Sequence, residues 1–139
     1  MIQFRNLVLL LVAACLSACA AGGAQTRQAQ TASERSTERW QAIIAGNHAL
    51  AYDYLTPGMR SAKTREAYVA EAAIKPVRYL AAKPFGESCE TDACTVNLEL
   101  EYEVAIPLAG VGKQRLPAYL DERWIRLDGR WYFLPDEIP

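Results

Sequence analysis

The sequence has little of what most metalloenzymes and nucleic-acid-binding proteins rely on. It contains one histidine and four cysteines in 139 residues, and its 15 basic side chains are outnumbered by 16 acidic ones. A single histidine leaves few nitrogen ligands for a zinc site, and the lack of a basic excess argues against a nucleic-acid partner. It also lacks a serine nucleophile elbow and a glycine-rich phosphate loop. These absences favour a binding protein over an enzyme, and we expect no metal and no cofactor.

The chain also lacks an apolar run long enough to cross a bilayer, but a shorter one lies near its start. Arg5 precedes an apolar stretch from Leu7 to Leu16, whereas a spanning helix needs about 20 residues. A basic residue, a short apolar stretch and then small residues are the layout of a secretory signal. We therefore expect residues 1–18 to be an export signal that is removed.

The end of this signal, Leu16–Cys19, resembles the lipobox of bacterial lipoproteins. The resemblance implies cleavage before Cys19 and acylation of that residue, and several acyl chains give a stable membrane anchor. Residues 20 and 21 are alanines, without the aspartate that keeps similar proteins of enteric bacteria at the inner membrane. We therefore expect an outer-membrane lipoprotein that faces the periplasm.

Two alternatives to the lipobox remain open. Ala18 and Ala20 flank Cys19 in the pattern that the general signal peptidase cuts, and cleavage there would release a protein that diffuses freely in the periplasm. In the other alternative the apolar segment is kept and the protein stays in the cytoplasm.

Cys89 and Cys94 are the two cysteines that remain in the folded part. They flank residues 90–93, Glu-Thr-Asp-Ala, which are typical of a turn, and an oxidising compartment would let them pair across a hairpin. Closing so short a loop contributes roughly 2 kcal/mol on the chain-entropy model. A redox-active pair would more often have two intervening residues, and zinc would need two more ligands, so a structural disulfide is expected.

Composition divides the rest of the chain into a tether and one domain. Up to residue 33 the chain is rich in Ala, Gly, Gln, Thr and Ser, which cannot form a buried core. The remaining residues are enough for one compact domain. The expected division is a signal peptide at 1–18, a lipidated cysteine with its tether at 19–33, and a domain at 34–139.

Helical patterns occupy the first half of this domain. The first predicted helix is capped by Ser33 or Ser36 and ends at residues 46–47, Gly-Asn. A second is expected over 48–55, ended by Thr-Pro-Gly at 56–58. A third is expected over 61–73. The residues of the third helix expected toward the core are Ala67, Tyr68, Ala70 and Ile74.

Strand patterns occupy the second half. Apolar residues alternate with polar ones from Thr95 to Ile106, which predicts a half-buried strand. Further strands are expected over 77–88, 114–127 and 130–134, the last two joined by the turn Asp128-Gly129. The order is an antiparallel meander of four strands. If the turn sets the register, Trp124 faces Phe133 and Arg126 faces Trp131.

Helices followed by this sheet resemble the nuclear transport factor two-like (cystatin-like) cone. The segments that carry the resemblance are Trp40 with the stop at 43–47, the stretch 51–57, and Trp124 through Tyr132. The resemblance implies an α+β fold in which N-terminal helices pack on a curved four-stranded antiparallel sheet. It implies no single activity, because this superfamily contains isomerases, dehydratases, hydrolases and proteins that only bind or dimerise.

Two ionisable residues are weak candidates for catalysis. Glu122 shares a strand face with Trp124, and burial would raise its pKa for proton exchange, although a bulge would instead turn it out to solvent. His48 lies four residues before Tyr52 and could pair with it, or simply be a helix cap. Asp53 resembles the aspartate of the isomerases only loosely. The row of Glu99, Glu101 and Glu103 could bind a cation or a basic partner, but a solvated face partly balanced by Arg115 and Arg123 is expected.

We therefore expect a non-catalytic envelope lipoprotein that binds a small apolar ligand, an envelope protein or a second copy of itself. The alternative is a small cofactor-independent enzyme of isomerase or hydrolase type that uses Glu122 or His48. A deep pocket ending on a desolvated Glu122 would favour the enzyme. A cone filled by aromatic residues would favour the binding protein. The residues expected to line the pocket are Trp40, Tyr52, Tyr102, Trp124 and Phe133.

Overall fold

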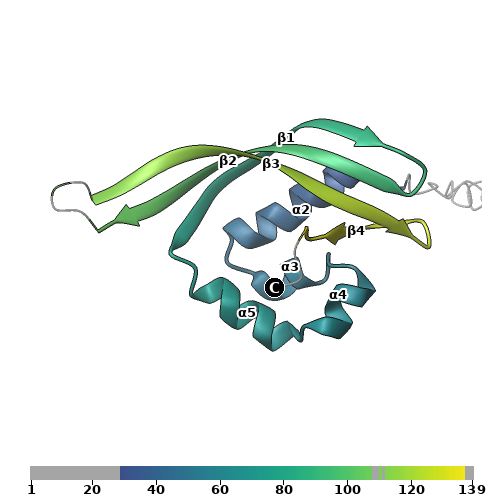
Figure 1. The fold of residues 1–139 in the computed structure, drawn as a ribbon, viewed down its shortest axis with the longest axis horizontal. Coiled ribbons are helices and arrows are strands. Elements are labelled where there is room, and N and C mark those ends of the chain that lie inside the picture. Colours follow the sequence, from purple (N-terminus) through teal and green to yellow (C-terminus); the bar gives the residue numbers. More distant parts are fainter. Residues whose placement is uncertain (1–28, 108–109, 111, 137–139) are drawn as a thin grey trace, which may run out of the picture.

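The computed structural model describes residues 29–107, 110 and 112–136. The signal, the lipobox and most of the tether lie outside these residues. Within these residues four helices precede four strands, which lie in the order β1-β2-β3-β4, each antiparallel to its neighbour. Figure 1 shows the helices on one face of the curved sheet. The fold is therefore α+β, with helices packed on a curved four-stranded antiparallel sheet, as the resemblance implied. The elements are α2 (Ala32–Ile44), α3 (His48–Tyr52), α4 (Pro57–Ala62), α5 (Arg65–Ala73), β1 (Val77–Cys89), β2 (Ala93–Ile106), β3 (Gly112–Leu127) and β4 (Arg130–Leu134).

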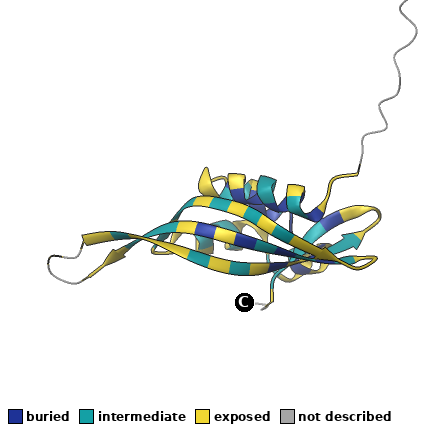
Figure 2. Cartoon of the chain, turned by 90° about the horizontal axis from the view of Figure 1, so that it is seen from above, coloured by how far each residue is buried: buried dark blue, intermediate teal, exposed yellow. Residues whose placement is uncertain are grey.

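The strands form where side chains alternate between two environments. Val96, Leu98 and Leu100 on β2 are buried against the helices, while Glu99 and Glu101 between and beyond them are exposed. The same alternation runs along the sheet in Figure 2. A strand that alternates in this way has one register that buries its apolar face, so the strand predictions are confirmed to within a few residues.

The β3–β4 hairpin has the predicted register. Asp128 and Gly129 both have positive φ, 50° and 75°, as a two-residue turn matched to the sheet twist requires. Trp124 therefore pairs with Phe133, and Arg126 pairs with Trp131. The two rings of the first pair lie with their centroids 5.8 Å apart.

Two irregularities bend β1 around the helices. The register with β2 shifts between Tyr79 and Ala81 and again between Pro84 and Gly86. At the second shift a Cβ on Gly86 would lie 2.8 Å from Oδ1 of Asn97, so a larger residue there would require the Asn97 side chain to move. Bulges of this kind increase local twist, and they curve β1 over α2.

The first helix begins earlier than predicted. Its cap is Thr31, not Ser33 or Ser36: the Thr31 hydroxyl accepts from the Glu34 backbone nitrogen, and the Glu34 side chain accepts from the Thr31 nitrogen. This reciprocal capping box satisfies two backbone donors that Ser33 alone would leave open. The first two residues of α2 therefore fall within the stretch assigned to the tether.

The helix boundaries predicted between residues 48 and 73 are wrong. Thr56 and Pro57 were expected to end a helix, but Thr56 caps α4 and Pro57 occupies its first turn, where a missing N–H costs nothing. α3 ends at Tyr52, and Thr64 caps a separate α5. Proline and a capping residue mark a helix start as readily as a helix end, so the pattern was ambiguous.

The predicted inward face of the third helix is also wrong. α5 contains no buried residue, Ala67 and Ala70 are exposed, and Ile74 is 82% exposed. Only Tyr68 packs inward, against a small cluster of Tyr52, Leu55 and Met59. α5 is therefore an outer layer over α3. None of the described helices is long and apolar enough to span a membrane.

Candidate functional site

Glu122 is the most enclosed ionisable side chain near the centre of the fold. It lies on the inner face of β3, opposite Val96 on β2, and is 2% exposed. The pairing of β2 with β3 continues without a shift through this position. The alternative that a bulge turns Glu122 out to solvent is therefore wrong.

The Glu122 carboxylate accepts four hydrogen bonds, two at each oxygen. Oε1 accepts from Arg39 Nη1 at 2.7 Å and Trp40 Nε1 at 2.8 Å. Oε2 accepts from Ser36 Oγ at 2.7 Å and Trp124 Nε1 at 3.1 Å. An ionised carboxylate offers about four acceptor positions, so this one has no free lone pair for a substrate proton.

Ser36, Arg39 and Trp40 reach Glu122 because they share one face of α2. Residues three and four apart in a helix are neighbours, and this face packs against the sheet. Ser36 and Arg39 are buried although they are polar, and so is Arg35 on the same helix. Polar residues at helical spacing beside Trp40 are the sequence signal that would have pointed to a buried network.

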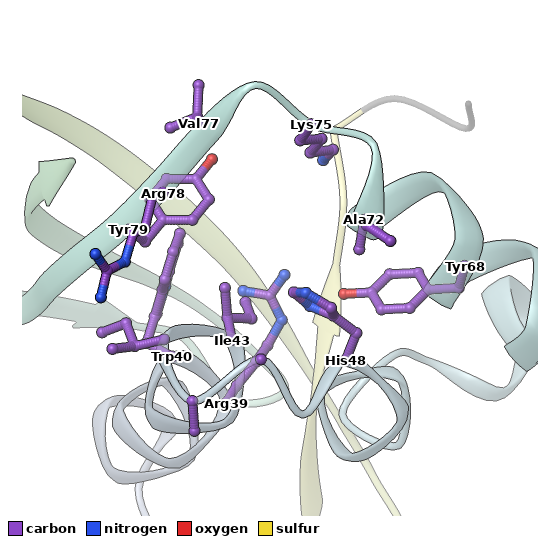
Figure 3. A pocket seen from close by; sticks show the side chains of 14 residues that line it. Arg39, Trp40, Ile43, His48, Tyr68, Ala72, Lys75, Val77, Arg78 and Tyr79 are labelled. Atoms are coloured by element: carbon purple, nitrogen blue, oxygen red, sulfur yellow. The ribbon is translucent and has the colours of Figure 1, made fainter. Parts of the chain in front are cut away.

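Beside this network, a pocket of about 430 Å³ lies between α2, α5 and the start of β1. Trp40 and Tyr79 form one wall, with ring centroids 5.0 Å apart in an edge-to-face contact. Ile43, Ala72 and Val77 add aliphatic surface. Figure 3 shows Arg39 reaching up into this space from α2. The volume falls within the range of small-molecule sites.

The polar groups of the pocket are mostly basic. Arg39 is a buried cation on its floor, His48 is half-buried, and Lys75 is an exposed cation at the junction of α5 and β1. Arg78 is also part of the lining, but its guanidinium points away from the other side chains in Figure 3. Among the 14 described residues that line the pocket, none is acidic.

Arg39 has more donors than partners. Its hydrogen bond within the described residues runs from Nη1 to Glu122, and its Nε is buried with no acceptor. Its Cζ lies 3.8 Å from the centroid of Phe133, a stacked cation–π contact. These contacts hold the Arg39 side chain in place, while some of its guanidinium N–H groups have no acceptor among the residues described.

The structure places His48 at the pocket but does not pair it with Tyr52. The Tyr52 hydroxyl donates toward the backbone oxygens of Arg60 and Lys63, at 3.0 and 2.8 Å, which ties α3 to the end of α4. In Figure 3 it is the Tyr68 hydroxyl that points toward His48. Tyr68 was expected only as a core residue, so its place in the pocket was missed.

Of the residues expected to line the pocket, Trp40 does so. Trp124 is fully buried in the core, Phe133 packs against it, and Tyr52 belongs to the cluster under α5. Tyr102 pairs with Tyr79 across β1 and β2 and is half-buried. Arg39, Tyr68 and Lys75 were missed because their convergence depends on how three elements pack.

The remaining acidic candidates lie on the surface. Asp53 forms a two-bond ion pair with Arg65, at 2.6 and 3.2 Å. On the outer face of the sheet, Glu101 lies 3.9 Å from Arg115, and Glu103 lies 3.2 Å from Lys113. Apart from the partly buried Glu103, these side chains are exposed, and such pairs contribute little to stability.

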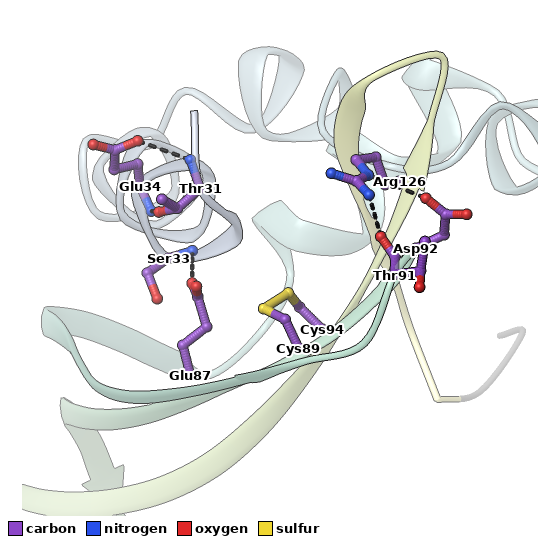
Figure 4. Close-up of a disulfide and its surroundings, with 9 residues drawn as sticks. All are labelled: Thr31, Ser33, Glu34, Glu87, Cys89, Thr91, Asp92, Cys94 and Arg126. Carbon is purple, nitrogen blue, oxygen red and sulfur yellow. Dashed lines mark hydrogen bonds and ion pairs between the residues drawn. A yellow bond between two sulfur atoms is a disulfide. The ribbon is translucent and has the colours of Figure 1, made fainter. Parts of the chain in front are cut away.

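Cys89 and Cys94 face one another at the β1–β2 turn and are joined as a disulfide (Figure 4). Glu87 lies close enough to form a metal-ligand group with them. Its carboxylate instead accepts from the Ser33 nitrogen at 2.7 Å, and disulfide sulfurs are not thiolate ligands. Arg126 donates to Asp92 and to the Thr91 carbonyl, which fixes the turn to β3.

Shifted pKa values occur at the other end of α2. Burial lowers the pKa of Arg35, and repulsion from Arg130 lowers it further. Burial also raises the pKa of Tyr54, with a further contribution from its hydrogen bond to Glu38. Both groups stabilise the packing of α2 and lie outside the pocket.

No protein-family model matches the chain, and no curated protein matches its sequence. Among solved structures, the chain is similar to a SEC-C motif containing protein from Rhodopseudomonas palustris, with 19% identity and a TM-score of 0.58 over 79% of this chain and 80% of that one. It is similar to a SEC-C motif containing protein from Psychrobacter arcticus, with 14% identity and a TM-score of 0.58 over 78% of this chain and 60% of that one. A looser likeness, at 13% identity and a TM-score of 0.46, is to a candidate ketosteroid isomerase from Shewanella frigidimarina, covering 76% of this chain and 93% of that one. At these identities the first two likenesses show that helices followed by a curved antiparallel sheet are a fold this chain shares, and nothing about activity.

Proposed function

We propose that this protein is a membrane-anchored envelope lipoprotein whose domain binds a small molecule in the pocket between α2, α5 and β1 without transforming it. The observation that carries the proposal is that Arg39 and Trp40 line this pocket, whereas Glu122, to which both donate, is not among the lining residues and has all four acceptor positions occupied. The site can hold a ligand, but the carboxylate best placed for proton transfer is committed to structure.

The alternative is a cofactor-independent enzyme acting through Glu122. In this geometry Glu122 is not available as its general base. A general base needs a lone pair within reach of the proton that it removes. Freeing an oxygen of Glu122 would leave the indole of Trp40 or Trp124, or the hydroxyl of Ser36, buried without an acceptor. Such unsatisfied donors are costly, which supports a binding role.

The membrane part of the proposal rests on the sequence Leu16–Cys19 and on the tether that follows. The disulfide between Cys89 and Cys94 is compatible with an oxidising compartment outside the cytoplasm. A domain on a flexible tether at a membrane can sample ligand in the periplasm while it remains attached. The natural occupant is a molecule that is present in that compartment.

The binding proposal is tested by NMR on the chain from Ala20 onward, with isotope-labelled methyl groups. Two probes of equal shape are titrated separately to millimolar concentration: 2-naphthoate, which is an anion, and 2-naphthamide, which is neutral. We expect at least one of them to shift the methyl signals of Ile43, Ala72 and Val77 in a saturable way. If neither probe shifts these signals, the pocket is not a binding site and the proposal is wrong.

A further inference from the structure

We infer that the ligand of this pocket carries a carboxylate on an apolar body, and that the carboxylate binds the free donors of Arg39. This inference rests on the binding function proposed above and names the class of ligand. It departs from the sequence-based expectation of a purely apolar ligand. Three features of the site lead to it: the unused donors of Arg39, the absence of an acid among the lining residues, and the mixture of basic and apolar walls.

The first feature is the surplus of donors on Arg39. A guanidinium has five N–H groups in a planar fork, and Arg39 uses only Nη1 toward Glu122 within the described residues. The side chain is buried, so the other groups are poorly hydrated. A buried donor without an acceptor is unfavourable, and a planar carboxylate matches the guanidinium fork.

Glu122 cannot supply the missing acceptors. Each of its oxygens already accepts two hydrogen bonds, from Arg39 and Trp40 at Oε1 and from Ser36 and Trp124 at Oε2. A second hydrogen bond from Arg39 would have to displace one of these donors. Because Arg39 lines the pocket, a ligand bound there can supply an acceptor to those Arg39 donors that reach the pocket surface.

The charge around the pocket favours an anion. Lys75 is an exposed cation on one side of it, His48 lies on its wall, and the Tyr68 hydroxyl points toward His48 in Figure 3. With no acidic residue among the lining side chains, nothing in the described wall repels a carboxylate. These groups line the same pocket as Arg39.

The other side chains that line the pocket favour a ligand whose body is apolar. Trp40 and Tyr79 present aromatic surface, and Ile43, Ala72 and Val77 present aliphatic surface. An inorganic anion would leave this surface without a partner, whereas an aromatic or branched aliphatic acid would cover it. The site thus fits an organic acid better than a bare oxyanion.

The test compares dissociation constants of 2-naphthoate and 2-naphthamide for the same tethered chain by calorimetry and NMR. We expect the anion to bind about tenfold more tightly, because a charge-assisted hydrogen bond replaces a neutral one. Its affinity should fall as sodium chloride is raised, since salt screens exposed charge. Equal constants for both probes would overturn the inference while leaving the binding function intact. No binding of either probe would remove the binding function itself.

Variants locate the anion within the pocket. Lys75→Gln removes one cation and should weaken 2-naphthoate about twofold, with no change for 2-naphthamide. Lys83→Gln removes the same charge from exposed β1 and should change neither constant. Arg39→Lys keeps the charge but loses the fork, and should weaken 2-naphthoate about tenfold. If Lys75→Gln and Lys83→Gln have equal effects, the attraction is general and the inference is wrong, whether or not Arg39→Lys folds.

Discussion

At the scale of single residues, the Glu122 carboxylate joins the helical layer to the sheet. Its four donors come from two elements, three from α2 and one from β3 itself. A buried carboxylate paired with an arginine tolerates burial only while its remaining acceptor positions are filled. Ser36 and the two indoles fill them, which is why a charged pair is stable here next to Val96 and Leu98, both fully buried.

Replacing Glu122 with glutamine tests this role. The amide has the shape of the carboxylate, but it loses the ion pair with Arg39 and turns one acceptor into a donor facing other donors. We expect the free energy of unfolding in urea to fall by about 3 kcal/mol, as for the loss of one partner of a buried ion pair. Glu99→Gln, on the exposed face of β2, is the matched control and should change it by less than about 0.5 kcal/mol. Equal effects of the two variants would contradict the role of Glu122 as a structural centre.

The sequence could place Glu122 on the inner face of its strand, because strand alternation is a local property. It could not identify the partners of Glu122. Ser36, Arg39 and Trp40 precede it by 86, 83 and 82 residues, and their convergence depends on how α2 crosses the sheet. The same limit explains why His48 was recognised as a candidate while Arg39 was not.

At the scale of elements, strands were more predictable than helices. β2 alternates regularly from Ala93 to Glu101, and the Asp128-Gly129 turn has one favoured geometry, so the register of the β3–β4 hairpin followed from the sequence. The segment from 48 to 73 has weak helical patterns, and the alanine-rich α5 has no fully buried residue. Caps at Asn47, Thr56 and Thr64 begin these helices, but the sequence offers several such residues and does not show which of them serve as caps.

The disulfide belongs to the β1–β2 element, and its contribution can be measured there. We expect the double variant Cys89→Ala/Cys94→Ala to lower the free energy of unfolding by roughly 2 kcal/mol through the freer unfolded chain. Dithiothreitol should lower the stability of the natural chain by a similar amount and leave the double variant unchanged. A reductant effect of equal size on both proteins would mean that the disulfide is not its cause.

α5 should be the least protected helix of the domain. It has no buried residue, whereas six residues of α2 are buried, among them Trp40. Local opening is easiest where few apolar contacts are lost. We expect α5 amides to exchange with solvent at least about tenfold faster than those of α2, as measured by hydrogen exchange and mass spectrometry.

Because Tyr68 and Ala72 line the pocket, saturating 2-naphthoate should slow exchange in α5 but not in β3. Exchange in α5 that is as slow as in α2 without ligand would contradict this view of the helix.

At the scale of the whole molecule, the fold class and the strand order could be predicted because they follow from the sequence of element types. The pocket could not, because it exists only where three elements meet. The membrane anchor is predicted independently of the fold. Its prediction depends only on the local sequence of residues 16–19. It therefore stays a prediction with a direct test.

That test is the mass of the N-terminal peptide from membrane fractions of cells that make the full chain. We expect a peptide that begins at Cys19 and carries acyl chains, in the outer-membrane fraction. Cys19→Ala should abolish acylation and move the protein out of that fraction, while Cys15→Ala, within the predicted signal, should do neither. An unmodified terminus at Ala21 in the soluble periplasmic fraction would mean that the general signal peptidase processes this protein.

The network around Glu122 also constrains how this protein can evolve. Any single replacement among Ser36, Arg39, Trp40, Glu122 and Trp124 leaves a buried group without its partner, so the effects of such replacements are not additive. An apolar core of equal volume is nonetheless a stable alternative to a buried ion pair. Descendants of this domain should therefore either keep the five side chains together or exchange them together, and a lineage that has lost Glu122 should have lost Arg39 as well.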